Sequence, residues 1–243
     1  MGIIDIFKRN KKGELVKKYH ENGKLREEGN IKINGEKEGL WKFYYENGQL
    51  EIEQNFKDDK LEGLFKQYYE NGLLEIEGNY KDDKLEGLIK QYYENGQIKS
   101  EVNFKDDELK GDWITYYENG QIEEEANFKD DNQEEFCKFY HENGKLMEEG
   151  NIKINGEKEG LWKSYYENGN RMGLINFKDS KREGLCLVFH ENGQIESDGN
   201  FKDDRQDGLW KWYHENGQIR SEVNWKGGEV ESEVNWKDGE IVD

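Results

Sequence analysis

The sequence has no proline and only two cysteines among its 243 residues. Two cysteines cannot build the disulfide framework on which many small secreted domains depend. No apolar run approaches the roughly 20 residues of a membrane-spanning helix, and the first ten residues lack the long apolar stretch of a secretory signal. These absences predict a cytoplasmic protein and make membrane association an unfavoured interpretation.

Basic residues are also under-represented, with 36 Lys and Arg against 55 Asp and Glu and a formal net charge of −19. Nucleic-acid binders need clustered basic side chains to neutralise phosphates, so we expect no nucleic-acid partner. An acidic surface instead attracts cations, which favours a basic protein partner. The 13% aromatic content, including 7 Trp and 14 Tyr, argues against the disorder that such a polar composition would otherwise suggest.

A repeat dominates the chain. The tripeptide Glu-Asn-Gly occurs nine times, with glycine at positions 23, 48, 72, 96, 120, 144, 169, 193 and 217. The spacing is 24 residues, stretched twice to 25. We expect a repeat array over residues 14–220, preceded at 1–13 by a cap or short helix. It is followed at 221–243 by shortened capping repeats, because terminal repeats are usually atypical.

Each repeat predicts a β-hairpin. Asn-Gly between two alternating runs is typical of a two-residue type I′ turn. The fold class is therefore all-β, an elongated antiparallel meander of about nine hairpins. This register places Lys90 opposite Glu101 on one face and Ile89 opposite Val102 on the other. Further Lys–Glu pairs in the same register are Lys17–Glu28, Lys42–Glu53, Lys66–Glu77, Lys138–Glu149 and Lys211–Glu222.

The face opposite the Lys–Glu pairs is predicted to carry columns of apolar and aromatic side chains. A stripe of this size exceeds the apolar area that soluble proteins normally expose. It must curl on itself, pair with a second copy in a homodimer, or be covered by a partner. Aromatic residues are frequent interface anchors, so the candidate partner-binding residues are Trp41, Tyr45, Phe65, Tyr69, Tyr93, Trp113, Tyr117, Trp162, Tyr166, Trp210 and Trp212.

The repeat resembles the MORN-repeat variant family, specifically the YwqK-type antitoxins. The shared string is Gly-Leu-Trp-Lys-x-Tyr-Tyr-Glu-Asn-Gly-Gln-Leu/Ile, followed by Glu-Gly-Asn-Phe/Tyr-Lys-Asp; residues 38–58 and 62–82 fit it well. The resemblance covers nearly everything from Glu14 to Asp243. It implies an elongated, non-enzymatic binding protein and, in antitoxin members, one that neutralises a cognate toxin.

The residues that could carry chemistry all sit at repeat positions, whereas a catalytic site normally occurs once. The four histidines, His20, His141, His190 and His214, replace tyrosine before Glu-Asn-Gly, so we interpret them as members of an aromatic column. Cys137 and Cys186 fall two repeats apart, about 19 Å along the sheet, too far for a disulfide. Paired aspartates such as Asp58-Asp59 are interpreted as a solvated ridge. We therefore expect no catalytic residue, metal or cofactor.

Three classes of function remain open from the residues. The first is an antitoxin or immunity protein that occludes a basic toxin, plausibly a nuclease. The second is a structural scaffold that self-associates. The third is a membrane-associated module, in which Ile3, Ile4, Ile6 and Phe7 with the nearby lysines touch an anionic surface; the alternative role for that segment is to cover the first sheet edge.

Overall fold

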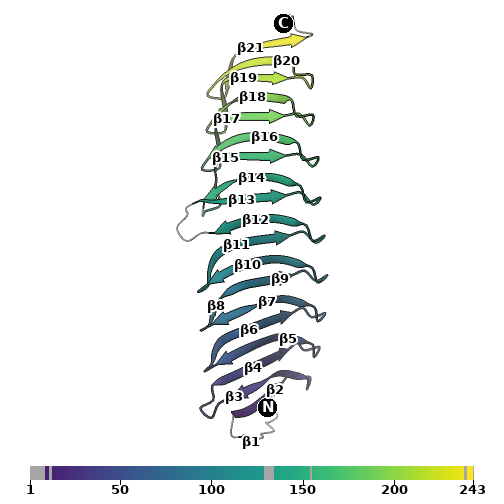
Figure 1. Ribbon diagram of the computed structural model, residues 1–243, viewed down its shortest axis with the longest axis vertical. Coiled ribbons are helices and arrows are strands. Elements are labelled where there is room, and N and C mark those ends of the chain that lie inside the picture. Colours follow the sequence, from purple (N-terminus) through teal and green to yellow (C-terminus); the bar gives the residue numbers. More distant parts are fainter. Residues whose placement is uncertain (1–8, 11–12, 129–133, 154, 238–239, 243) are drawn as a thin grey trace. The chain divides into compact units, whose positions relative to one another are not determined.

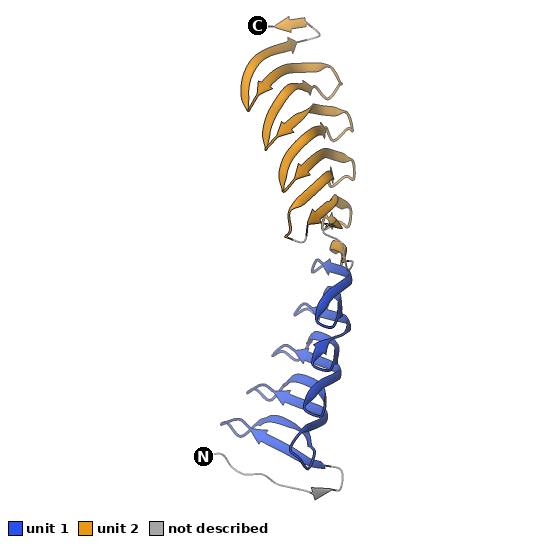
Figure 2. Ribbon diagram, turned by 90° about the vertical axis from the view of Figure 1, so that its left-hand side faces the viewer, with its two compact units in different colours: residues 1–120 blue, residues 121–243 orange. Residues whose placement is uncertain are grey.

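A computed structural model describes residues 9–10, 13–128, 134–153, 155–237 and 240–242. These residues fall into two compact units, Met1–Gly120 and Gln121–Asp243 (Figure 2). Every regular element in the described part of the chain is a β-strand, and each unit is an antiparallel meander of hairpins (Figure 1). The predicted all-β repeat fold is confirmed. No helix capable of crossing a membrane occurs within the described residues.

Unit 1 contains strands β1 to β11, and successive strands pair with one another. The short β8 pairs with β7, which also pairs directly with β9. The strands are β1 (Arg9–Asn10), β2 (Gly13–Tyr19), β3 (Leu25–Ile31), β4 (Lys37–Tyr44), β5 (Leu50–Lys57), β6 (Lys60–Tyr68), β7 (Leu74–Lys81), β8 (Lys84–Leu85), β9 (Gly87–Tyr92), β10 (Ile98–Lys105) and β11 (Glu108–Tyr116).

Unit 2 continues the same pattern, with each strand antiparallel to the next. The strands are β12 (Ile122–Phe128), β13 (Glu134–Tyr140), β14 (Leu146–Lys153), β15 (Lys158–Tyr165), β16 (Arg171–Lys178), β17 (Lys181–Phe189), β18 (Ile195–Lys202), β19 (Arg205–Tyr213), β20 (Ile219–Lys226), β21 (Glu229–Lys237) and β22 (Glu240–Val242). The strands β20 and β21 turn through Gly227 and Gly228, both with positive φ, so the shortened C-terminal repeats are plain hairpins.

The predicted register is confirmed away from the turns. In the β9–β10 hairpin Lys90 pairs with Glu101 and Ile89 with Val102. The Lys90 Nζ lies 2.7 Å from a Glu101 carboxylate oxygen. Lys138 keeps its position opposite Glu149, but its Nζ lies 3.6 Å from Glu125 instead.

The predicted type I′ turn at Asn-Gly is wrong. Gly96 has a φ of 84°, but among the described residues Asn95 is not one of those with positive φ. The Gly96 N–H donates to the Tyr93 carbonyl and the Tyr93 N–H to the Gln97 carbonyl, each at 2.8 Å. This is a type I turn closed by a left-handed glycine. The extra residue creates a bulge, so Tyr92 pairs with Ile98 rather than with Lys99.

The true type I′ turns lie at the other end of the hairpins. Asp82 and Asp83 have φ of 49° and 68°, and the residues flanking them, Lys81 and Lys84, pair directly. The same geometry recurs at 58–59, 106–107, 179–180 and 203–204. We call this side of each unit the aspartate edge, and the side with the Glu-Asn-Gly turns the glutamate edge.

The inner face of each unit carries the tryptophan column and forms the core. Trp41 lies flat over Gly29 of the neighbouring strand, where an added Cβ would approach the ring to 2.2 Å. Its Nε1 donates to the Asn30 carbonyl at 3.0 Å. Trp162 over Gly150 and Trp210 over Gly199 repeat this arrangement in unit 2. Because glycine has no side chain, it leaves room for the indole ring to lie against the backbone of the neighbouring strand.

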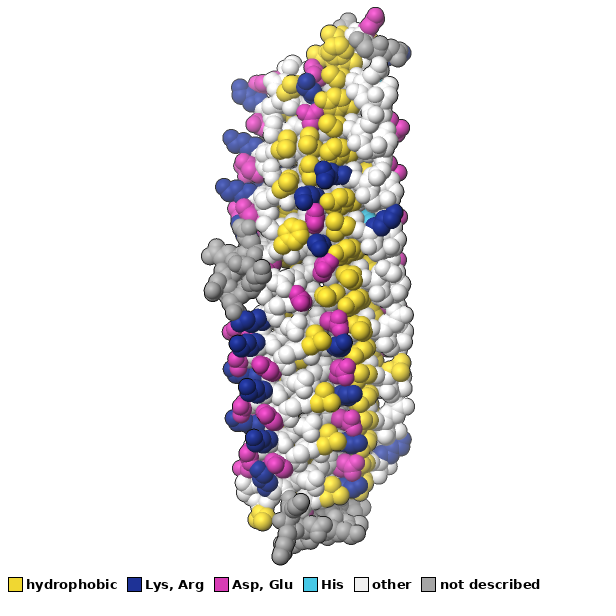
Figure 3. All heavy atoms as spheres, in the orientation of Figure 1, with side chains coloured by type: hydrophobic (Ala, Val, Ile, Leu, Met, Phe, Trp, Pro, Cys, Tyr) yellow, Lys and Arg dark blue, Asp and Glu magenta, His cyan; other side chains and the backbone are white. Residues whose placement is uncertain are grey.

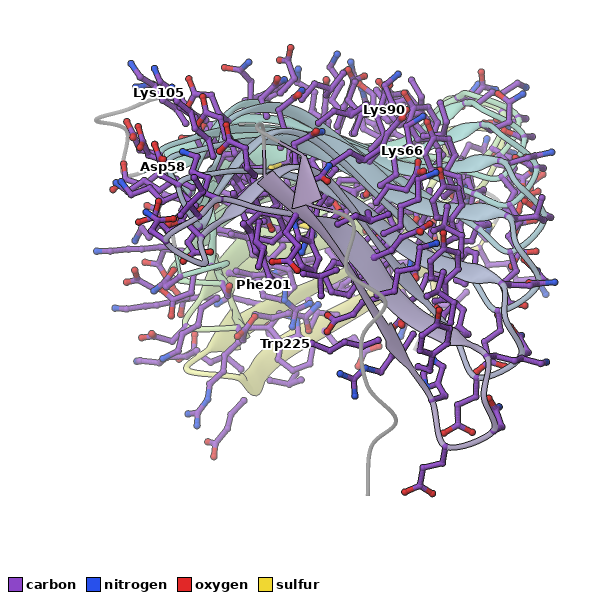
Figure 4. The ribbon with its side chains drawn as sticks, turned by 90° about the horizontal axis from the view of Figure 1, so that it is seen from below. Asp58, Lys66, Lys90, Lys105, Phe201 and Trp225 are labelled. Atoms are coloured by element: carbon purple, nitrogen blue, oxygen red, sulfur yellow. The ribbon has the colours of Figure 1, made fainter. Side chains whose placement is uncertain are left out.

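The outer face carries the Lys–Glu pairs. Figure 4 shows Lys66 and Lys90 on the outer side of the curved strands, while Phe201 and Trp225 lie on the inner side of theirs. Most of the glutamates on this face also accept a hydrogen bond from a tyrosine of the next repeat, as in Tyr116 Oη to Glu101 at 2.9 Å. Burial, followed by this bond, raises the pKa of Tyr116 to about 12. These contacts join each hairpin to the next.

A ladder of side-chain hydrogen bonds also joins the repeats along the glutamate edge. Tyr69 Oη donates to the Tyr92 carbonyl, and Tyr93 Oη to the Tyr116 carbonyl, both at 2.6 Å. His141 Nε2 makes the equivalent bond to the Tyr165 carbonyl at 3.0 Å. His20 and His190 make the same bond to the Tyr44 and Tyr213 carbonyls, so these three histidines replace tyrosine in role as well as in position.

The start of the chain is described only in part. Residues 1–8 and 11–12 lie outside the described residues, so the predicted short helix and the Ile3–Phe7 membrane contact lie there too. Arg9 and Asn10 form a short strand that pairs with Glu14 and Gly13. This strand covers part of the first sheet edge.

Candidate binding surfaces

The predicted aromatic anchors divide by burial. Trp41, Trp162 and Trp210 are only 2%, 3% and 3% exposed, so in this conformation they are core residues and present little surface to a partner. The other eight are partly buried: Tyr45, Phe65, Tyr69, Tyr93, Trp113, Tyr117, Tyr166 and Trp212. Of the three ways to cover the stripe, curling within the chain accounts for the tryptophan column.

The tyrosines on this face are also used structurally. Tyr45 and Tyr166 donate to the Tyr68 and Phe189 carbonyls at 2.7 and 2.6 Å. Trp212 stacks on Trp210 with ring centroids 5.8 Å apart. The parts of these side chains that a partner could contact on the inner face are therefore the edges of the rings. Partner binding at this face remains a prediction.

The aspartate edge is solvated, as expected, and it is also anchored: the Asp82 and Asp203 side chains are 69% and 72% exposed and still contact the preceding repeat. The Asp83 carboxylate accepts the Leu61 N–H at 2.7 Å, and Asp82 lies 3.1 Å from Lys60 Nζ. Glu62 accepts the Asp82 N–H at 3.0 Å. Carboxylates here are paired with lysines and backbone amides of the preceding repeat, and Figure 3 shows basic and acidic side chains interspersed along this edge, so most of its charge is compensated.

The glutamate edge is different. Apart from Glu142, its turn glutamates are exposed and, among the described residues, make no ion pair: Glu21, Glu46, Glu70, Glu94 and Glu118 in unit 1, and Glu167, Glu191 and Glu215 in unit 2. Lys24 and Lys145 reach this edge but donate to the backbone carbonyls of Asn47 and Asn168. Successive turns lie two strands apart, about 9.6 Å. Uncompensated negative charge is therefore spaced regularly along this edge.

In the part of the chain that the structure describes, the two thiols are buried and the carboxylates form no cluster suited to a metal ion. Cys137 and Cys186 are free and buried, with exposures of 0% and 2%. Burial raises the pKa of each thiol to about 11, the opposite of what a nucleophilic cysteine requires. Within the described residues no group of three His, Cys, Asp or Glu side chains is placed to hold a metal ion.

The sequence reasoning missed an exposed apolar row on the outer face. In most repeats a leucine, or phenylalanine at position 136, directly precedes the tryptophan-column residue; it points outward, opposite to that residue, and stays 40–49% exposed. Unit 1 carries it at Leu15, Leu40, Leu64 and Leu88, and unit 2 at Phe136, Leu161, Leu185 and Leu209. We call it the leucine row. Strict alternation along the strand predicts this outward position, but it does not predict how much of each side chain stays exposed.

Comparison with known protein families now places the chain. The model of the MORN repeat variant matches residues 15–32, 37–58, 61–82, 85–106, 109–130, 137–153, 158–179, 182–203 and 206–226. The chain belongs to the MORN repeat variant family. Its matched segments coincide with the hairpins described above, so this MORN repeat protein is a scaffold of nine repeats.

Other comparisons add little. The chain matches no curated protein. Among solved structures it is similar to TcdB2-TccC3 and TcdB2-TccC3-Cdc42, each at 12% identity with a TM-score of 0.23. It covers 13% of each of those chains, while the match spans 92% of this chain. Likeness at this TM-score does not establish a shared fold.

Proposed function

We propose that this MORN repeat protein binds a basic protein and neutralises it as an antitoxin or immunity protein. The observation that supports this is the row of uncompensated glutamates along the glutamate edge, because the outer-face and aspartate-edge carboxylates are largely paired with lysines. Such a row raises the local concentration of a cationic partner and speeds its docking. The partner's own activity, plausibly that of a nuclease, would then be blocked by occlusion.

The mechanism is steric and electrostatic. The backbone of each Glu-Asn-Gly turn is fixed by its own hydrogen bonds, as when Asn95 Oδ1 accepts the Gln97 N–H at 2.9 Å. Several of these turns are also tied to the next, as by Asn22 Nδ2 to the Glu46 carbonyl at 2.9 Å. The carboxylates are therefore held on a rigid frame. A preorganised surface loses less conformational entropy when it binds.

The experiment uses the product of the reading frame next to this chain's gene. Co-expression of the chain should restore growth of cells that produce that protein, and the purified pair should form a complex. The double variant E70Q/E94Q should slow association several-fold at low salt, an effect that high salt removes by screening. The matched control E229Q/E240Q removes two exposed charges outside the glutamate edge and should bind like the wild type.

Two results would contradict the proposal. One is a neighbouring product that neither harms cells nor binds the chain. The other is a complex in which both double variants behave alike, because the glutamate edge would then have no special part in binding.

A further inference from the structure

The leucine row of unit 1 lies beside a second regular feature of the outer face. Along the strands from β2 to β10, lysine and glutamate alternate: Lys17, Glu28, Lys42, Glu53, Lys66, Glu77, Lys90 and Glu101. The neighbouring row alternates in the same way between leucine and asparagine: Leu15, Asn30, Leu40, Asn55, Leu64, Asn79, Leu88 and Asn103. Figure 3 shows the two rows side by side on this face.

We infer that this outer face of unit 1 is an interface with a second copy of the chain, independent of the proposed toxin binding. A two-fold axis parallel to the strands, passing midway between Glu53 and Lys66, maps each row onto itself in reverse order. Because each row alternates between two residue types and has an even number of members, reversal places every residue over one of the other type. Every lysine of one copy then lies over a glutamate of the other, beginning with Lys66 over Glu53, and the symmetry is that of an isologous dimer.

The same operation interlocks the apolar side chains. Each leucine of one copy falls over an asparagine of the other, in the gap between two of its leucines, so that the rows interdigitate. Leu40 and Leu64 are 45% and 46% exposed and would be covered at the centre of the contact. Their remaining exposed apolar surface is the driving force for association.

The charge distribution favours this face for self-association. The chain carries a net charge of −19, so most contacts between copies would bring like charges together. On this face the carboxylates already hold ammonium partners, as in Lys42–Glu53 at 2.9 Å and Lys66–Glu77 at 3.5 Å. Each ammonium has three N–H donors, so it can bond a carboxylate in the partner without releasing its own.

A second copy also fits the repeat distance better than a helix does. The leucines recur about every 9.6 Å, whereas seven residues of an α-helix span about 10.5 Å. A helix would therefore lose register by nearly 1 Å at each repeat. A copy of the same sheet keeps register along the whole unit. The strip measures about 40 Å by 17 Å from strand spacing and rise. The area that two such strips would bury lies near the low end of specific interfaces. We therefore expect a weak dimer whose population depends on protein concentration.

Unit 2 does not offer the same surface. Its alternation is interrupted where Lys163 pairs with Leu174 and Leu187 with Asp198. Its own leucines, Leu161 and Leu185, are 45% and 44% exposed. They match Leu40 and Leu64 in type, repeat position and exposure, and therefore provide a control within the same chain.

Sedimentation equilibrium of the full-length chain, over low to several hundred micromolar protein, tests this inference. The wild type should shift from one chain mass to two. The variant L40N/L64N should raise the dissociation constant on the order of tenfold or more, and L40D/L64D should abolish the dimer. The control L161N/L185N should dimerise like the wild type, and circular dichroism should show that all variants fold.

A wild type that stays monomeric at the highest concentration overturns the inference and leaves the row to a different partner. It is equally overturned if L161N/L185N weakens the dimer as much as L40N/L64N does. Neither result bears on the toxin-binding proposal, which depends on the glutamate edge and is tested with E70Q/E94Q.

Discussion

Glycine beneath tryptophan is the residue-scale feature on which the core depends. Trp162 is 3% exposed because its ring lies flat on Gly150. Lys158 covers the other side of the ring, with its Nζ 3.8 Å from the ring centroid. A single-layer sheet can therefore bury a large aromatic side chain between a backbone and an alkyl stem, without a second layer.

Replacing Gly150 by alanine tests this arrangement. The new Cβ would lie 2.5 Å from the Trp162 ring, so the indole must move, and overpacking of this kind typically costs about 1–3 kcal/mol. Gly173 is the control, because its Cβ would meet only Ser164 Oγ at 3.0 Å and the Leu187 carbonyl oxygen at 3.5 Å. Urea unfolding should rank G150A well below G173A, and equal free energies of unfolding would refute the packing described.

Glu124 is a second informative residue. Burial, and then the charge of Glu123, raises the pKa of its carboxyl group, and the described residues provide it with no hydrogen bond or ion pair. A folded-state pKa above the unfolded value means that its contribution to stability is full at low pH and is lost as pH rises through the folded pKa.

E124Q should therefore be more stable than the wild type at pH 7, by on the order of 1 kcal/mol, because burying a carboxylate charge costs more than burying a neutral amide. The advantage should disappear at pH 4, where the wild-type carboxyl group is protonated. Thermal melting at both pH values measures this difference. An advantage that is unchanged between the two pH values would rule out titration of Glu124 as its cause.

At the scale of the hairpin, stability comes from bonds that cross from one repeat to the next. The Tyr69 hydroxyl donates to a backbone carbonyl 23 positions further along the chain. Such a bond ties neighbouring hairpins at the glutamate edge, whereas the chain itself connects them at the aspartate edge. The array should therefore unfold in units larger than one repeat.

Y69F removes this bond and leaves the ring in place, so unfolding should become easier by about 1 kcal/mol. Tyr19 provides the control, because it is 54% exposed and its hydroxyl makes no hydrogen bond to the described residues. Y19F should leave the urea midpoint unchanged. A Y69F midpoint equal to that of Y19F would show that the ladder contributes nothing.

The hairpin scale also shows what sequence could and could not predict. Alternation along the strands placed Lys90 against Glu101, because residues two apart must share a face. The turn type could not be assigned from Asn-Gly alone, since Asn95 stabilises a type I turn with its own side chain and leaves the positive φ to Gly96. The roles of Asp82 and Asp83 depend on contacts with the preceding repeat, which local patterns do not reveal.

At the scale of each unit, the same alternation separates three surfaces with different chemistry. Tryptophans fill the inner face, leucines and Lys–Glu pairs occupy the outer face, and uncompensated glutamates line one edge. Burial of Trp41 and Trp210 could not be predicted from their apolar character, because an exposed stripe and a curled one have the same sequence pattern. The curl leaves the outer face and the glutamate edge as the accessible surfaces of each unit.

The two consecutive residues of each Leu-Trp pair face opposite environments, the leucine solvent and the tryptophan the core. Hydroxyl-radical footprinting with mass spectrometry measures this directly, residue by residue, in the native chain. We predict oxidation of Leu40, Leu161 and Leu209, which are 45%, 45% and 49% exposed, and protection of Trp41, Trp162 and Trp210, which are 2–3% exposed. Tryptophan is intrinsically the more reactive side chain, so it escapes oxidation only where it is buried. Rapid oxidation of these tryptophans in the folded protein would show that they do not form the core of the inner face.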